Sequence, residues 1–150
     1  MFKIRKITVL LLTVFFCGTA TYAQTGDEVS DKEVTQFVAA VKKVQVINQE
    51  SQEDMLKAVE EAELDIQRFN EIYGAMQDPN TEVDASDEEM EKFNKANTEI
   101  VNIQTEAQQK MEKVILEQDM TVERYQEINM QIQNDPELMQ KVQTLLQEEG

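Results

Sequence analysis

The chain has 150 residues, of which 14 are basic and 30 acidic, and its formal net charge is −16 at pH 7. Nucleic acids and anionic membrane surfaces bind proteins through lysine and arginine, so this charge excludes both as expected partners. The sequence has no histidine and a single cysteine. We therefore expect no catalytic histidine, no cofactor and no metal site of the usual nitrogen and sulfur type. We also expect no catalytic cysteine, because the single cysteine, Cys17, lies in the segment that is predicted below to be removed.

The first residues follow the pattern of a secretory signal peptide. Lys3, Arg5 and Lys6 precede a short apolar run, and small residues allow cleavage just before Gln24. The apolar run has about half the length that a membrane-spanning helix needs. We therefore predict a signal peptide at residues 1–23 and an exported protein, either periplasmic or secreted.

Two alternatives use the same segment of the chain. It could stay in place as a membrane anchor, or the chain could be lipidated at Cys17. A lipidation site needs a small residue before the cysteine, but Phe16 stands there, so we do not expect a lipoprotein. After cleavage the chain has no cysteine and has lost three basic residues, which gives a net charge of 11 − 30 = −19.

The remainder, residues 30–150, predicts a single domain that contains a repeated unit. A shift of 56 positions aligns residues 30–78 (unit 1) with residues 86–134 (unit 2) without a gap. We expect residues 24–29 to be a flexible N-terminus and residues 79–85 to be the linker between the units. The aligned pairs include Phe37 with Phe93, Ala40 with Ala96, Arg68 with Arg124 and Ile72 with Ile128.

Each unit is predicted to begin with a long helix. Ser30 with Glu33, and Ser86 with Glu89, have the spacing of a capping box, in which serine and glutamate satisfy amides at the helix start. Apolar residues then recur at helical spacing for about thirty residues. The end is expected near Glu63 or Asp119. The apolar stripe has few apolar residues in its middle, at Asn48 and Ser51 in unit 1 and at Gln104 and Ala107 in unit 2. This gap indicates either a close approach of a neighbouring helix or an exposed segment.

A short helix follows in each unit, within the similar nonamers "LDIQRFNEI" (residues 64–72) and "MTVERYQEI" (residues 120–128). Asp65 and Thr121 are suitable N-caps. The apolar residue before each cap can pack on the aromatic residue four positions into the helix, which is a hydrophobic staple. We expect each nonamer to turn the chain and to lay the short helix back against the long one.

Unit 2 has one further element. Asp135 followed by Pro136 is a helix start, and the apolar spacing after it predicts a terminal helix over residues 136–148. The predicted fold class is all-α: a helical bundle of two repeated αα-hairpins, each a long and a short helix, with a C-terminal extra helix. The duplication suggests a pseudo-two-fold arrangement of the units.

Arg68 and Arg124 are the candidate functional residues. They could contact a partner carboxylate or another anion at equivalent positions of the repeat. They could also have a structural role and bind glutamates of the same chain, with Glu71 or Glu61 as candidates for Arg68 and Glu127 or Glu117 for Arg124. Because acidic residues greatly outnumber basic ones, we favour the structural role.

Two other groups of residues have side chains that can bind metal ions. Met55 and Met111 are equivalent in the repeat and could bind copper(I), but we expect them to fill the core. The acidic residues clustered around Glu60 and Asp87 lack the spacing of a calcium loop, so we expect a solvated acidic surface and no metal.

The doubled unit resembles a family of small exported bacterial proteins known as domain of unknown function forty-one sixty-eight. The resemblance covers roughly residues 30 to 145 and includes "KKVQVINQESQEDMLKAVEEAELDIQRFNEI" and "FNKANTEIVNIQTEAQQKMEKVILEQDMTVERYQEI". The family usually has glycine before the apolar residue of each nonamer, where this chain has Glu63 and Asp119. The resemblance implies no activity and no site residues.

A weaker similarity is to periplasmic stress chaperones, whose Leu-Thr-x-x-Gln signature half fits Met120–Arg124. We expect an exported, non-enzymatic helical protein that interacts with an unknown protein partner or has a structural role in the cell envelope. The alternatives are a periplasmic holdase-type chaperone or stress adaptor and, in third place, an enzyme that works through carboxylates alone. The sequence also allows a homo-oligomer.

Overall fold

The described part of the chain is built from α-helices. The computed structural model describes residues 28–78 and 82–148, and no strand occurs among them. The all-α fold class is thus confirmed, whereas the predicted signal peptide lies outside the described residues. The helices are α1 (Asp31–Glu61), α2 (Ile66–Gln77), α3 (Asp87–Leu116), α4 (Val122–Asn134) and α5 (Pro136–Glu148).

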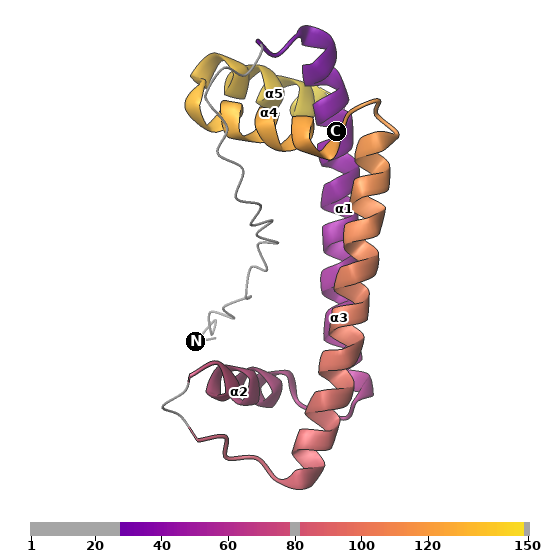
Figure 1. The fold of residues 1–150 in the computed structure, drawn as a ribbon, viewed down its shortest axis with the longest axis vertical. Helices are drawn as coiled ribbons and strands as arrows, with labels where there is room; N and C mark the ends of the chain where they lie inside the picture. Colours follow the sequence, from indigo (N-terminus) through magenta and orange to yellow (C-terminus); the bar gives the residue numbers. More distant parts are fainter. Residues whose placement is uncertain (1–27, 79–81, 149–150) are drawn as a thin grey trace, which may run out of the picture.

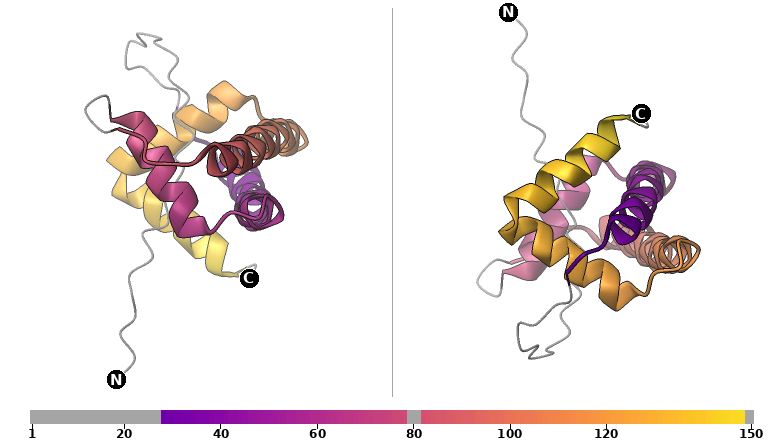
Figure 2. Two further views of the ribbon diagram at one scale, coloured as in Figure 1. Left: turned by 90° about the horizontal axis from the view of Figure 1, so that it is seen from below. Right: turned by 90° about the horizontal axis from the view of Figure 1, so that it is seen from above.

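The two long helices, α1 and α3, lie side by side in opposite directions and form a stem (Figure 1). Helix α2 lies across one end of the stem, and helices α4 and α5 lie across the other end. We call α2 the lower arm and α4 with α5 the upper arm. Both arms project from the same side of the stem, as the views along its axis also show (Figure 2). None of the helices in the described ranges has both the length and the apolar character that membrane crossing requires.

The short helices do not lie back along their own long helices, as the sequence had suggested. They cross the stem near its ends instead (Figure 1). The reason is that the apolar stripes are rich only near their ends, while the middle of the stem presents polar residues such as Asn48 and Gln104. A short apolar helix therefore buries more surface by crossing an end of the stem than by lying along its middle.

The predicted helix starts are present. The Ser30 hydroxyl accepts from the Glu33 amide at 3.3 Å, while the Glu33 carboxylate accepts from the Ser30 amide at 2.9 Å. The same capping box occurs at the start of α3. At α5, the Asp135 carboxylate accepts from the Glu137 and Leu138 amides at 2.9 and 3.1 Å, which caps the helix as expected.

Each long helix is followed, within two or three residues of its end, by a residue with left-handed backbone conformation. Glu63 has φ 57° and Asp119 has φ 53°. At the end of α1 the Glu63 amide donates to the Glu60 carbonyl at 2.9 Å, and the next amide donates to the Val59 carbonyl at 3.3 Å. This is the Schellman pattern, whose left-handed position is normally glycine. Both residues stand where glycine would avoid the steric cost that a side chain imposes.

Most of the buried residues form two separate cores, one at each end of the stem. The lower core consists of Val59, Ala62, Leu64, Phe69, Ile72, Phe93 and Ala96. The upper core consists of Val34, Phe37, Val38, Ala40, Ile115, Met120, Ile128, Leu138 and Val142. Each core combines the start of one long helix with the end of the other and with the short helix that follows that end. Neither repeat unit therefore has a core of its own.

The fifth helix covers only the upper core. Val38 is 2% exposed in the upper core, which also contains Leu138 and Val142 of α5. Its equivalent in unit 2 is Asn94, which is exposed. The polar replacement explains why the lower core is stable without a fifth helix, because no apolar side chain needs cover at that position.

We predict that Glu63→Gly stabilises the protein by about 1 kcal/mol, since glycine removes the strain of a left-handed backbone. Asp119→Gly should stabilise it less, because aspartate tolerates this conformation better than glutamate does. Urea denaturation would measure both changes. As a control, Glu50→Gly at an exposed position inside α1 should cost about 1 kcal/mol; a loss of stability for Glu63→Gly as well would contradict the prediction.

We also predict that Val38→Asn destabilises the protein by about 3 kcal/mol. The substitution removes buried apolar surface and places an amide without a partner in the upper core. The reverse exchange in the other unit, Asn94→Val, should change the free energy of unfolding by less than about 0.5 kcal/mol because the position is exposed. Equal effects of the two exchanges, measured by thermal or urea unfolding, would show that α5 does not cover Val38.

Candidate functional site

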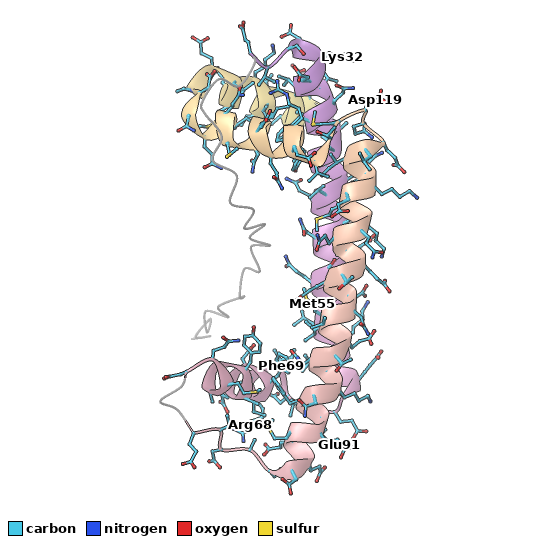
Figure 3. All side chains as sticks on the ribbon, viewed as in Figure 1. Lys32, Met55, Arg68, Phe69, Glu91 and Asp119 are labelled. Carbon is cyan, nitrogen blue, oxygen red and sulfur yellow. The ribbon has the colours of Figure 1, made fainter. Side chains whose placement is uncertain are left out.

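Arg68 and Arg124 occupy equivalent positions, each three residues after the N-cap of a short helix. The structure does not bring them together. Arg68 lies on the lower arm, at one end of the stem (Figure 3), whereas Arg124 lies on α4 of the upper arm. They therefore cannot form one shared anion site within a single chain.

Arg124 connects α4 to the first turn of α1, in the other unit. Its Nε donates to Glu33 Oε1 at 2.7 Å, and its Nη1 donates to Glu127 Oε2 at 3.0 Å. The Arg124 side chain is 20% exposed and the Glu33 side chain 28%, so the pair is mostly shielded from water. A charge-assisted hydrogen bond in such a setting is stronger than one at an open surface.

Arg68 makes the equivalent connection between α2 and the first turn of α3. Its Nε donates to Glu89 Oε1 at 2.7 Å, its Nη1 donates to Glu71 Oε2 at 3.2 Å, and its Nη2 contacts Glu89 Oε2 at 3.3 Å. Nη2 also donates to the Asp84 carbonyl, in the segment between the units. Each arginine thus binds one glutamate of its own helix and one glutamate of the other unit.

The two glutamates that cap the long helices are the same ones that the arginines bind. Glu33 accepts hydrogen bonds from Arg124 and from the hydroxyl and amide of Ser30, and these donors lower the pKa of Glu33 from 4.5 to about 2. Arg68 and the cap of α3 likewise lower the pKa of Glu89 from 4.5 to about 2. The bound glutamates raise the pKa of both arginines. Both pairs are therefore ionised at neutral pH.

An aromatic pair accompanies each of these ion pairs. The rings of Phe37 and Tyr125 lie 4.9 Å apart between their centroids, and those of Phe69 and Phe93 lie 4.8 Å apart. The two pairs are equivalent in the repeat, since Phe93 corresponds to Phe37 and Tyr125 to Phe69. Each pair joins a short helix to the start of the other unit's long helix. Burial raises the pKa of Tyr125.

The structural role of the arginines is supported by these contacts. The predicted partners Glu71 and Glu127 are confirmed, whereas Glu117 lies 3.5 Å from Lys43. Sequence reasoning missed the glutamates of the opposite unit. The signal was present, since both are capping-box residues with a free carboxylate oxygen, but nothing in the sequence shows that the short helix crosses to the other unit. Contact of Arg68 or Arg124 with a partner or an anion stays a prediction.

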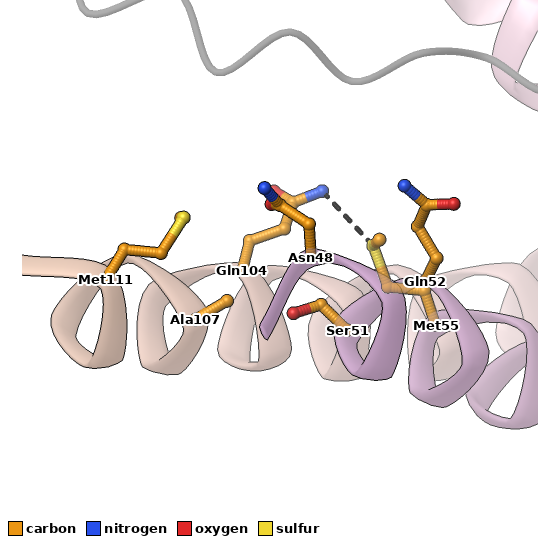
Figure 4. Close-up of a pocket in the computed structure, with 7 residues that line it drawn as sticks. All are labelled: Asn48, Ser51, Gln52, Met55, Gln104, Ala107 and Met111. Atoms are coloured by element: carbon orange, nitrogen blue, oxygen red, sulfur yellow. Dashed lines mark hydrogen bonds between the residues drawn. The ribbon is translucent and has the colours of Figure 1, made fainter. Parts of the chain in front are cut away.

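A shallow pocket opens at the middle of the stem, between α1 and α3 (Figure 4). Its side chains come from equivalent parts of the two units and none is charged. It faces the side from which the arms project, where Met55 is also visible in Figure 3. We call this surface the inner face. It is lined by Asn48, Ser51, Gln52, Met55, Gln104, Ala107 and Met111.

Each of the two interpretations of the middle of the apolar stripe, close helix approach and an exposed segment, holds for different residues of the pocket. Ala107 is buried and Ser51 half-buried, with the Ser51 hydroxyl bonded to the Ile47 carbonyl at 2.7 Å, so these small residues lie where the helices approach. Asn48, in contrast, is exposed on the inner face. The small residues therefore lie between the two helices, whereas the amide of Asn48, one turn away, is available to solvent or to a partner.

The two methionines line this pocket and belong to neither core, contrary to the expectation that they fill the core. Met55 and Met111 are half-buried and lie at opposite ends of the pocket (Figure 4). The Gln104 side-chain amide contacts the Met55 sulfur at 3.7 Å. Within the described ranges, no group of three or more Cys, Asp or Glu residues is arranged to hold a metal ion.

The absence of charge extends beyond the pocket itself. Every residue three or four positions before or after Asn48, Met55, Gln104 and Met111 is uncharged. These positions lie on the same helix faces as the pocket residues. Two segments of the arms are uncharged as well, residues 72–77 of α2 and 128–134 of α4, whereas α5 carries Glu137 and Lys141. The inner face is thus an uncharged surface in a strongly acidic protein, a feature that sequence analysis did not detect.

We predict that stability falls between about pH 4.5 and pH 2, because folding holds the pKa of Glu33 and of Glu89 near 2. A carboxylate whose pKa is lowered by folding contributes stability above its unfolded pKa and loses it as pH falls through the folded value. Arg124→Gln should cost about 1.5 kcal/mol at pH 7 and little at pH 2. Urea unfolding at several pH values would measure the difference.

The matched control for this experiment is Lys43→Gln. Lys43 lies 3.5 Å from Glu117, and both side chains are about half exposed, at 48% and 47%. Such a pair contributes less than about 0.5 kcal/mol. A difference between wild type and Arg124→Gln that stays constant from pH 7 to pH 2 would contradict the assignment of this stability to ionised Glu33.

Comparison with known families agrees with the repeat. Two segments of the chain, residues 23–83 and 79–142, match the family model described as Domain of unknown function (DUF4168). One match spans unit 1 and the other unit 2, so the internal repeat and the resemblance noted from the sequence are both confirmed. No curated protein and no solved structure matches the chain. Since the matched segments span most of its length, the chain belongs to the family of the Domain of unknown function (DUF4168).

Proposed function

We propose that this protein is exported to the cell envelope and acts there without catalysis, by holding another polypeptide on its inner face. The observation that carries the proposal is the uncharged surface between the two arms, in a chain whose net charge is −16. The export step rests on the signal-peptide pattern of residues 1–23.

The chemistry of the inner face suits contact with protein. Asparagine and glutamine side chains each offer a hydrogen-bond donor and an acceptor, and methionine adapts its shape to irregular apolar surfaces. Leu56 and Val101 lie next to the pocket residues Gln52 and Gln104 at helical spacing, and they are 49% and 52% exposed. Exposed apolar residues grouped beside polar side chains are typical of interaction surfaces.

The proposal of a non-enzymatic role is supported by the sequence. The chain has no histidine, and its single cysteine lies in the predicted signal peptide, so the commonest general base and the commonest thiol nucleophile are both missing from the mature chain. Turnover of a peptide, ester or phosphate substrate that disappears when one carboxylate is changed would overturn it.

A holdase-type chaperone is the second candidate function. It is favoured by exposed methionines on both arms, since Met76 of α2 and Met130 of α4 are each 53% exposed. Flexible methionines suit a surface that binds many unfolded clients. Protection of an unfolded client from aggregation at several-fold excess of the protein would favour this function over a scaffold with one partner.

The proposed function predicts where a crosslink should form in cells. A photo-crosslinking amino acid placed at Gln52, which is exposed and lines the pocket, should yield adducts with another polypeptide chain on illumination. The same amino acid at Asn102 of α3 is the matched control. Asn102 is also exposed, but it lies two residues from Gln104 and so on another side of the helix.

Adducts would be detected as shifted bands on denaturing gels of the envelope fraction. We expect at least several-fold more adduct from position 52 than from position 102. Equal yields from both positions would show that the inner face has no special role, and recovery of the protein in the cytoplasm would contradict the envelope location.

A further inference from the structure

We propose that the inner face is the interface of a homodimer, in which the stem of one copy lies crosswise between the two arms of its partner. This inference rests on the proposed function and names the polypeptide that the inner face holds. It follows from the shape of the molecule, from the chemistry of the inner face and from the distribution of charge.

The space between the arms has the width of a stem. The lower arm meets α1 at Val59 and the upper arm meets it at Val38, which are 21 residues apart. At 1.5 Å per residue this separation is roughly 30 Å, and half a helix diameter on each side leaves about 20 Å free. Two packed helices with axes 8–10 Å apart are also about 20 Å wide. The stem of a second copy therefore fits between the arms.

The arms also determine the orientation of the partner. Both arms project from the inner face at the ends of the stem (Figures 1 and 2). Two copies that approached inner face to inner face with parallel stems would bring arm against arm and keep the faces apart. A turn of about a right angle places each stem between the arms of the other copy, and a single two-fold axis relates the two copies, as in most homodimers.

The chemistry of the inner face is complementary to itself. Asn48 and Gln52 form no side-chain hydrogen bond with any described residue, and each amide can donate to and accept from an identical amide. A surface of carboxylates could not pair with a copy of itself in this way. Met55 and Met111, at the two ends of the pocket, can adjust to fill the gaps between crossed helices.

The charge distribution favours this face for contact between two copies. Two copies of a chain with net charge −16 repel one another, and the repulsion is smallest where no charges meet. The inner face and the arm segments 72–77 and 128–134 are uncharged. Salt screens the remaining repulsion, so dimerisation should strengthen as ionic strength rises.

Sedimentation equilibrium of the purified protein over a range of concentrations tests the proposal. We expect a monomer–dimer equilibrium and at least a tenfold weaker dimer for the double variant Asn48→Asp/Gln104→Glu. This variant keeps the side-chain shapes but places four negative charges at the centre of the dimer. The control is Asn102→Asp/Gln109→Glu, which makes the same change of charge on exposed α3 residues outside the pocket and should leave the dissociation constant within about twofold. Circular dichroism shows whether both variants fold.

A wild-type protein that remains monomeric up to about 1 mM would overturn the proposal, because a specific dimer binds more tightly than that. So would a dimer that both double variants weaken equally, since its interface would lie elsewhere. Neither result touches the proposed function, which depends on crosslinks at position 52 in cells. Adducts of Gln52 with a different protein, together with a monomeric purified chain, would support the function and reject the homodimer.

Discussion

Each short helix is anchored on the first turn of the long helix of the other unit, and the rest of the structure depends on this exchange. Arg124 binds Glu33 and Arg68 binds Glu89, each at 2.7 Å. An aromatic pair packs beside each ion pair. The same glutamate caps its own helix, so one carboxylate fixes both the start of a long helix and the position of the arm that crosses it.

The exchange explains why the protein is duplicated. A single unit would present half of each core and one half of each ion pair, so its apolar residues would remain exposed. Two units in opposite directions complete both cores at once, and the two-fold relation repeats the arginine–glutamate pair and the aromatic pair at the other end. The fifth helix has no counterpart at the lower end, because it covers Val38, whose equivalent in unit 2, Asn94, is polar and exposed.

Concentration of the apolar contacts at the two ends leaves the middle of the stem free. The long helices approach there through the small residues Ser51 and Ala107, and they need no apolar side chains on the side between the arms. That side could therefore acquire amides and methionines without a loss of core packing. The inner face is therefore a consequence of the attachment of the short helices at the two ends of the stem. The arms that these helices form lie on either side of the inner face.

Local signals in the sequence determined the elements of this protein. Caps at Ser30, Asp65, Ser86, Thr121 and Asp135 and the spacing of apolar residues set where the helices begin and which faces they bury, because these signals join residues only a few positions apart. Tertiary structure alone decided that the short helices cross to the opposite unit, that Arg124 meets a glutamate 91 positions away, and that uncharged residues of both units form one surface. Helical periodicity shows which residues share a face of one helix, but it does not show which other helix that face meets.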